Sequence, residues 1–248
     1  TLETLDPELL SKFVREDQRN PTFELGDWAV KSLNHNEIID TTGGLYRFKS
    51  RGGDGQGENN WSIVLKIIKN PAESHQQPQE WAYWKREPLI FASDLLVELP
   101  GPLATPRCYG VTERDDSTWI WMEDIQESTE KRWSMEQFFF AAQQMGRFGA
   151  AYLKGKAQPK QPWLCPAFLR SLWADGGFWS TFMNPESPEN AWQSEVVKGA
   201  FSDAQRAEVL RICAEKVRFF DALDQLPQVF CHNDLHRRNL MIRTGPDG

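Results

Sequence analysis

One feature near the end of the sequence constrains the fold more than any other: a cluster of polar residues interrupts an apolar stretch. Residues 229–242 read VFCHNDLHRRNLMI, so the mostly polar residues 232–239, here called the polar loop, stand between two short apolar pieces. Short apolar runs of this kind predict buried strands. A loop held by strands on both sides is rigid and yet reaches solvent, which suits a functional carboxylate such as Asp234.

Two residues of the polar loop are the types that phosphoryl transfer needs. That reaction uses a carboxylate to orient or deprotonate the attacking hydroxyl, and an oxygen ligand for Mg²⁺ a short distance away. Asp234 and Asn239 fit these roles. The alternative is a polar turn in which Asp234 caps a backbone N–H and Asn239 adopts a left-handed conformation.

The composition favours a folded protein with a sizeable core. Of the 248 residues, 40% are hydrophobic, and the eleven Trp and fifteen Phe must pack against other side chains. The net charge of −7 and the lack of a long Lys/Arg block argue against a nucleic-acid partner. Because the four cysteines are scattered and no apolar run is long enough for a membrane span, we expect reduced thiols, no membrane partner and a cytoplasmic location.

The first half of the chain predicts strands and the second half predicts helices. The alternation of apolar and polar residues predicts strands over 30–39, 45–50 and 62–68. A helical period predicts a helix over 79–99 that is broken at Pro88. Turn residues between two further apolar runs predict a hairpin of 108–111 with 118–122. Past Glu123 the apolar period changes, which predicts a boundary between two parts near 124–130. The fold class expected is α+β.

Helix starts are marked by capping residues. Ser134 and Ser202 each precede a Gln by three residues, which predicts a capping box and a long helix after each serine. The apolar stripe of the second helix extends to Phe220. A further helix is expected over residues 6–14, whereas the sequence does not assign secondary structure to residues 158–190, which are rich in Trp, Phe, Pro and Gly.

The polar loop resembles the H-x-D-x-x-x-x-N catalytic loop of the aminoglycoside phosphotransferase and choline kinase family, relatives of the protein kinases. The resemblance implies a two-lobed, protein-kinase-like fold, with a strand-rich nucleotide-binding lobe over 1–125 and a mainly helical catalytic lobe over 126–248. It also implies ATP and Mg²⁺ as cofactors and a small-molecule hydroxyl as the phosphate acceptor. Asp234 would then be the catalytic base and Asn239 the metal ligand.

The same resemblance implies a lysine and an acidic partner upstream. Lys66 lies in the apolar run 62–68, where a cation is costly unless it is paired or faces a phosphate, and Lys69 is the fallback. Glu87 is the partner that the resemblance favours for Lys66, and Glu80 is the competitor. Pro88 departs from the family pattern, because a proline starts or kinks a helix rather than continuing it.

The resemblance implies that one short stretch, residues 42–44, contacts the phosphates of the nucleotide. Thr42, Gly43 and Gly44 occupy the position of the phosphate-covering loop, where small residues let backbone N–H groups approach phosphate oxygens. A plain hairpin turn is the alternative for them. The longer glycine-rich stretch, residues 51–60, predicts only a flexible surface loop.

Residues 119–125 resemble the fifth strand and hinge of kinases. The resemblance implies that the carbonyl of Glu123 and the N–H of Ile125 contact the adenine edge, while Met122 covers its face. A buried strand that runs into an acidic turn is the alternative.

One element of the family pattern is not recognisable in the sequence up to residue 248. A second Mg²⁺-binding Asp should follow Asn239, but Asp247 stands in a Gly-Pro-Asp-Gly turn pattern. We therefore expect the second Asp and the closing helices to lie beyond Gly248. Two other functions remain possible at this stage: a nucleotide-binding pseudokinase that serves as a binding module, and a protein kinase, against which no A-P-E element is recognisable.

Overall fold

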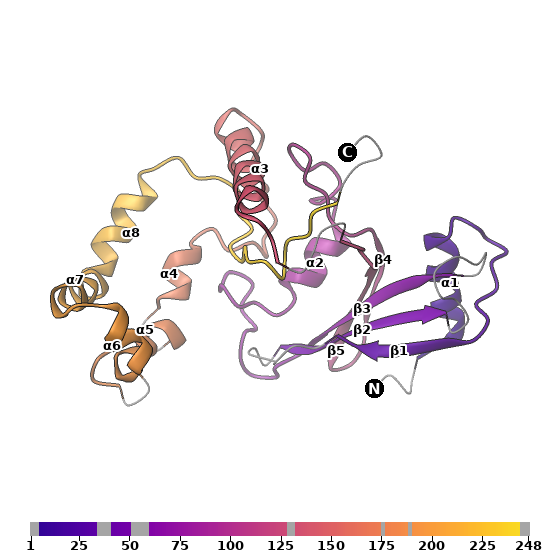
Figure 1. The fold of residues 1–248 in the computed structure, drawn as a ribbon, viewed down its shortest axis with the longest axis horizontal. Coiled ribbons are helices and arrows are strands. Elements are labelled where there is room, and N and C mark those ends of the chain that lie inside the picture. Colours follow the sequence, from indigo (N-terminus) through magenta and orange to yellow (C-terminus); the bar gives the residue numbers. More distant parts are fainter. Residues whose placement is uncertain are drawn as a thin grey trace. The chain divides into compact units, whose positions relative to one another are not determined.

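The computed structural model describes residues 5–33, 41–50, 60–127, 132–174, 177–187 and 190–243. Within these residues the chain forms five strands, eight α-helices and one short 3-10 helix, which confirms the α+β class (Figure 1). The chain divides into two compact units. We call residues 1–76, 84–159 and 230–248 the sheet unit, and residues 77–83 and 160–229 the helical unit.

The sheet unit is built on five antiparallel strands in the order β1-β2-β3-β5-β4. Their bounds are β1 Trp28–Ser32, β2 Thr42–Ser50, β3 Ser62–Lys69, β4 Cys108–Glu113 and β5 Ser117–Glu123. The predicted β4–β5 hairpin and the β3 strand are confirmed. The strand predicted over 30–39 is described only to Leu33, and its remaining residues lie outside the described part of the chain.

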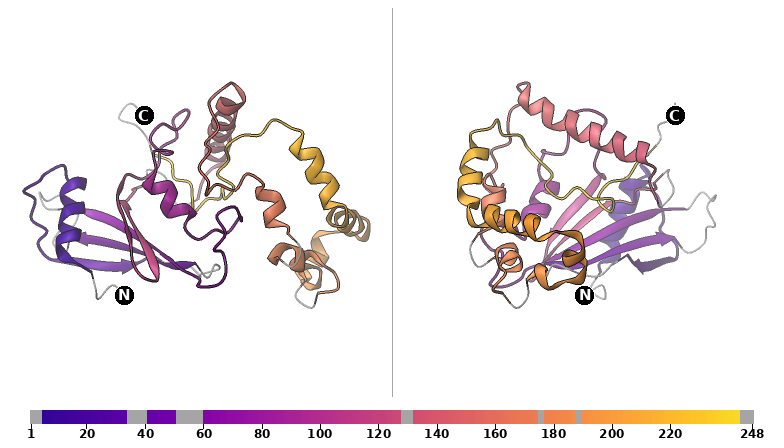
Figure 2. Two further views of the ribbon diagram at one scale, coloured as in Figure 1. Left: turned by 180° about the vertical axis from the view of Figure 1, so that it is seen from behind. Right: turned by 60° about the vertical axis from the view of Figure 1, so that its left-hand side comes forward.

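Helix α1, Pro7–Asp17, covers one face of the sheet (Figures 1 and 2). It starts where predicted, because the Asp6 side chain accepts a hydrogen bond from the Glu8 N–H and a proline occupies the first turn. Its apolar side chains join a core cluster with residues of four strands, Phe48, Ile63, Leu65, Tyr109 and Trp121 among them. The approach is close: a Cβ on Gly110 of β4 would lie 2.8 Å from the Phe13 ring.

A polar contact fixes the end of α1 to β4. The Tyr109 hydroxyl donates to Asp17 at 2.6 Å, and Arg107 donates to the same carboxylate oxygen at 3.2 Å. Burial and the hydrogen bond to Asp17 raise the pKa of Tyr109 above its usual range, so this phenol stays a donor at high pH.

Two helices complete the described sheet unit, α2 Arg86–Ala92 and α3 Met135–Leu153. The expectation of a helix over 79–99 is wrong, because only seven of those residues are helical. The capping box at Ser134 is present, with Gln137 as its partner. The buried residues of α3 are Gln144 and Phe148, whereas Phe138 near its start is 45% exposed.

The helical unit consists of short helices. They are α4 Phe168–Leu172, α5 Phe178–Met183, the 3-10 helix η2 Ala191–Gln193, α6 Glu195–Ala200, α7 Asp203–Ala214 and α8 Lys216–Asp224. The single long helix predicted from Ser202 to Phe220 is wrong, because Glu215 leaves the helical region with φ −94° and ψ 14°. After this break α8 packs on α4, where Arg170 binds Asp221 and Asp224, each at 2.7 Å.

Replacing Leu10 tests the packing of α1. Leu10 is fully buried, so Leu10→Ala should lower the free energy of unfolding by about 2–5 kcal/mol. Leu153 is a leucine at the end of α3 with 60% of its surface exposed, and Leu153→Ala should change that free energy by less than about 0.5 kcal/mol. Denaturant titration measures both variants, and equal losses would contradict the placement of α1 in the core.

Candidate functional site

Lys66 projects from the sheet face opposite α1. Neighbouring residues of a strand point to opposite faces, and residues directly across two antiparallel strands share a face. Ile63 and Leu65 belong to the core under α1, so Lys66 lies on the other face, opposite Leu45 of β2 and Ile120 of β5. Its side chain is 30% exposed.

The structure brings Lys66 and Glu87 together. The Lys66 Nζ lies 2.7 Å from Oε1 of Glu87, which is the pairing that the sequence favoured. The fallback, Lys69, is exposed at the end of β3. The competing partner, Glu80, belongs to the helical unit.

The short length of α2 explains how Pro88 can follow Glu87 directly. Because α2 begins at Arg86, Pro88 lies in its first turn, where backbone N–H groups have no partner within the helix. Pro88 is buried, and Glu87 occupies the acidic position favoured at a helix start. The proline therefore marks the beginning of this helix rather than a kink inside it.

The polar loop is supported differently from what the sequence predicted. Strands were expected on both sides of it, and this is wrong, because residues 229–243 form no strand. Instead, Phe230 packs against two aromatic residues of α3, with ring centroids 6.1 Å from Phe148 and 5.9 Å from Tyr152. Aromatic packing on a helix thus supports one end of the loop.

Asp234 and Asn239 contact each other directly. The Asn239 side-chain amide donates to Asp234 Oδ2 at 2.7 Å and to the Asp234 carbonyl at 3.0 Å. This orientation leaves the amide oxygen of Asn239 for another partner. The Asp234 side chain is 70% exposed, and His236 Nε2 lies 3.7 Å from Oδ1 of Asp234.

The backbone of the polar loop does not match the alternative interpretation, a simple turn in which Asn239 adopts a left-handed conformation. Asn233, with φ +62°, is its left-handed residue, and Asn239 does not have a positive φ. Nδ1 of His232 accepts a hydrogen bond from the Asp234 N–H at 3.3 Å. The His236 carbonyl accepts one from the Asn239 N–H at 2.9 Å. These local bonds close the turn between Asp234 and Asn239.

The phosphate-loop residues predicted at 42–44 belong to β2. Thr42 pairs with Ile68 and Gly44 with Ile67, with a register irregularity between them. A Cβ on Gly43 would lie 2.5 Å from the Ile67 side chain, and Gly44 has φ +131°. The expectation of a connection between strands at these residues is therefore wrong, because they belong to β2 and close strand packing favours glycine there. Their expected contact with phosphates stays a prediction. Residues 34–40, 51–59 and 244–248, including Asp247, lie outside the described part of the chain.

The last residue of β5 and the four residues after it form an acidic segment, 123–127, that connects distant parts of the sheet unit. Glu123 pairs with Ile63 in the sheet, and Ile125 lies just past the strand and is partly buried. Asp124, which the sequence did not single out, has only 3% of its side chain exposed. Its partner Arg47 stands 77 positions away in the sequence, so no local pattern could identify it.

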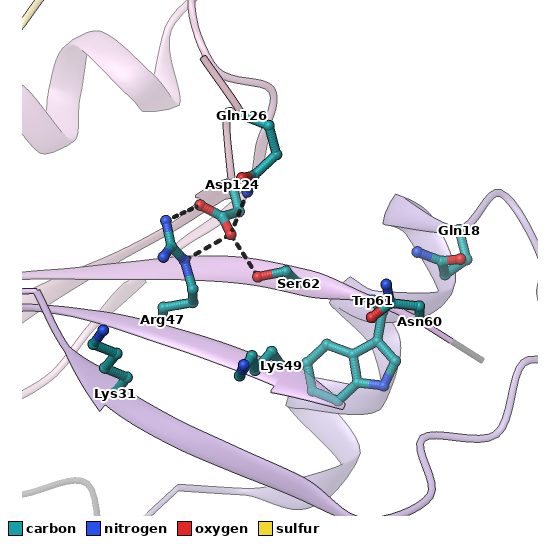
Figure 3. Close-up of a pocket in the computed structure, with 9 residues that line it drawn as sticks. All are labelled: Gln18, Lys31, Arg47, Lys49, Asn60, Trp61, Ser62, Asp124 and Gln126. Atoms are coloured by element: carbon teal, nitrogen blue, oxygen red, sulfur yellow. Dashed lines mark hydrogen bonds and ion pairs between the residues drawn. The ribbon is translucent and has the colours of Figure 1, made fainter. Parts of the chain in front are cut away.

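Asp124 accepts several hydrogen bonds (Figure 3). Arg47 Nη2 donates to Oδ1 at 2.8 Å and its Nε lies 2.7 Å from Oδ2, while the Ser62 hydroxyl donates to Oδ2 at 2.5 Å. Gln126 donates to Oδ2 at 3.0 Å. The network borders a cavity of about 540 Å³ on the sheet, whose lining also includes Lys31 and Lys49.

None of the described helices has the length and apolar character that crossing a membrane requires. In the described part, no cluster of three or more His, Cys, Asp or Glu side chains is arranged to hold a metal ion.

Comparison with known proteins identifies one family. The model of the phosphotransferase enzyme family matches residues 56–248, which is well over half of the chain. The matched range contains Lys66, Glu87, Asp234 and Asn239. Neither the curated proteins nor the solved structures gave a match.

Two adjacent carboxylates provide a test of the acidic segment. Asp124→Asn should lower the free energy of unfolding by about 2 kcal/mol, because it leaves Arg47 without its charged partner at a buried position. Glu123→Gln is the control, since the partners of Glu123, Arg107 and Arg243, are 44% and 59% exposed. Its cost should stay under about 1 kcal/mol. Denaturant unfolding compares the two, and a larger loss for Glu123→Gln would contradict the assigned role of Asp124.

Proposed function

Because the chain belongs to the phosphotransferase enzyme family, we propose that it transfers the γ-phosphate of ATP to a hydroxyl group of a small molecule. Membership of this family indicates phosphotransferase activity and a protein-kinase-like fold. The observation that carries the proposal is the contact between Asp234 and Asn239 at 2.7 Å on an exposed loop. The reaction requires a carboxylate and an oxygen ligand for Mg²⁺, and this contact, made by the Asn239 amide nitrogen, places the two side chains next to each other.

All the residues proposed for the site belong to one compact unit. Lys66, Glu87, the acidic segment and the polar loop are parts of the sheet unit. The division into a nucleotide-binding lobe over 1–125 and a catalytic lobe over 126–248 belongs to the same proposal.

Asp234 is proposed to accept the proton of the attacking hydroxyl or to orient that hydroxyl. Its exposed carboxylate can be reached by a substrate, and the Asn239 amide fixes its direction by donating to Oδ2. An oriented carboxylate aligns the hydroxyl with the phosphorus atom before the bond forms, which lowers the entropic part of the barrier.

The donor set of the polar loop fits Mg²⁺. This ion keeps several waters and binds through one or two protein oxygens together with phosphates. The Asn239 amide oxygen would hold the ion, next to the Asp234 carboxylate that is proposed to act on the hydroxyl. When bound, Mg²⁺ neutralises charge on the phosphates.

Lys66 is proposed to bind the α- and β-phosphates. Its ion pair with Glu87 holds the ammonium group on the sheet face that is free of α1. The ion pair restricts the flexible Lys66 side chain, so Lys66 loses less conformational entropy when it binds a phosphate. The carbonyl of Glu123, the N–H of Ile125 and the stretch Thr42 to Gly44 remain the proposed contacts of the base and the phosphates.

The proposed reaction takes place in the cytoplasm. All four cysteines, Cys108, Cys165, Cys213 and Cys231, are free thiols, which is what a reducing compartment maintains.

The decisive variant is Asp234→Asn. The amide has the shape of the carboxylate but cannot accept the proton, so transfer from Mg·ATP to a panel of small alcohols and to water should fall at least about 100-fold. Asp115→Asn, in the exposed β4–β5 turn, is the matched control and should leave the rate unchanged. Radiolabelled ATP measures transfer, and calorimetry measures ATP binding, which should persist in both variants. An unchanged rate in Asp234→Asn would refute the assignment, and ATP binding without any turnover in the unmodified protein would favour the pseudokinase.

A further inference from the structure

The Glu127 side chain joins three segments of the sheet unit. It lies at the end of the acidic segment and is 20% exposed. Its Oε1 accepts hydrogen bonds from the Trp133 indole at 3.0 Å and from the Ile242 N–H at 3.3 Å, and its Oε2 accepts one from Arg237 at 2.6 Å. One carboxylate thus links the residues after β5, the residues before α3 and the end of the polar loop.

Arg237 is the residue that connects the polar loop to this carboxylate. Its guanidinium donates to Glu127 and to the Leu240 carbonyl at 3.1 Å, and it lies 4.5 Å from the Trp133 ring centroid. Bidentate or stacked arginines are held in a defined geometry by such contacts. The guanidinium is therefore directed at Glu127. To contact the transferred phosphate, Arg237 would have to leave this carboxylate.

Arg237 is also the one member of residues 232–239, all of them described, that is not exposed. Asp234 and Asn239, on either side of it in the sequence, contact each other but remain open to solvent. The side-chain attachment of the loop to the rest of the sheet unit therefore depends on the Arg237 contacts.

We propose that Glu127 is a positioning residue for phosphoryl transfer, which acts by holding Arg237 and through it the relative positions of Asp234 and Asn239. This inference rests on the proposed function of the polar loop. It adds a residue from the acidic segment, whose other end provides the proposed base contacts at Glu123 and Ile125. Glu127 thereby connects the segment proposed to contact the base with the loop proposed to carry out the transfer.

The experiment compares Glu127→Gln with a neighbouring control. The glutamine oxygen can still accept from Trp133 and Ile242, but it has no charge for Arg237, so the change removes the charge-assisted bond selectively. Arg238→Gln is the control, because Arg238 is adjacent in the loop and exposed. Two readouts are needed: amide hydrogen exchange at Asn239, whose N–H bonds to the His236 carbonyl, and kcat and KM for Mg·ATP.

We expect Glu127→Gln to speed exchange at Asn239 by about tenfold and to lower kcat by about tenfold, while KM for ATP stays within about twofold. Arg238→Gln should change neither readout. The double variant Glu127→Gln with Arg237→Gln should be no worse than the worse single variant, because both changes break the same contact.

The outcomes separate this inference from the proposed function. Exchange at Asn239 that is no faster in Glu127→Gln than in Arg238→Gln overturns the positioning role, whatever the activity. Faster exchange with an unchanged kcat overturns it as well. Faster exchange in a protein that transfers no phosphate even without substitutions supports the anchoring by Glu127 and contradicts the proposed function.

Discussion

The sheet unit depends on the burial of one face of its sheet by α1. Leu10, Phe13 and Val14 remove the α1 side of the sheet from water, and the alternation of side chains in β3 then fixes where each residue points. Ile63 and Leu65 must face the helix, so Lys66 must face away from it. A register shift of one residue would place the ammonium in the core, at a cost that no partner there could offset. Hydrophobic packing on one side thus determines the chemistry that is possible on the other.

Charged contacts perform a different task, which is to join segments that hydrophobic packing does not bring together. Asp124 binds Arg47 and Ser62 and so fixes the acidic segment to the sheet, while Glu127 binds Arg237 and fixes the same segment to the polar loop. A carboxylate that accepts several hydrogen bonds restricts all of its donors at once, and low exposure strengthens each bond. The two carboxylates are separated by only two residues, so the sheet and the loop are connected through a very short piece of backbone.

The sequence was sufficient to predict a contact where the signal is local, or where the order of motifs along the chain restricts which residues can be partners. Ser134 with Gln137 forms its capping box within one turn, and Lys66 and Glu87 meet as the resemblance implied, because a strand and the next helix are close in sequence and in space. It failed where the local structure depends on contacts between residues that are far apart in the sequence. Strands were expected beside the polar loop, whereas Phe230 packs on α3; the glycines before Leu45 were interpreted as a loop, whereas strand pairing takes them into β2. No short window of sequence contains the arginine partner of Asp124 or of Glu127, because Arg47 and Arg237 are 77 and 110 positions away.

The polar loop must satisfy two opposing requirements, and different side chains meet them. A group that acts on a substrate has to be accessible, and the Asp234 carboxylate, 70% exposed, meets this requirement. An accessible group on an irregular loop is also mobile, and a displacement of about 1 Å can cost two orders of magnitude in rate. The contacts of Asn239 with Asp234 and of Arg237 with Glu127 restrict the backbone without covering the carboxylate. Rigidity therefore comes from the less exposed Arg237, and reactivity is left to its exposed neighbours.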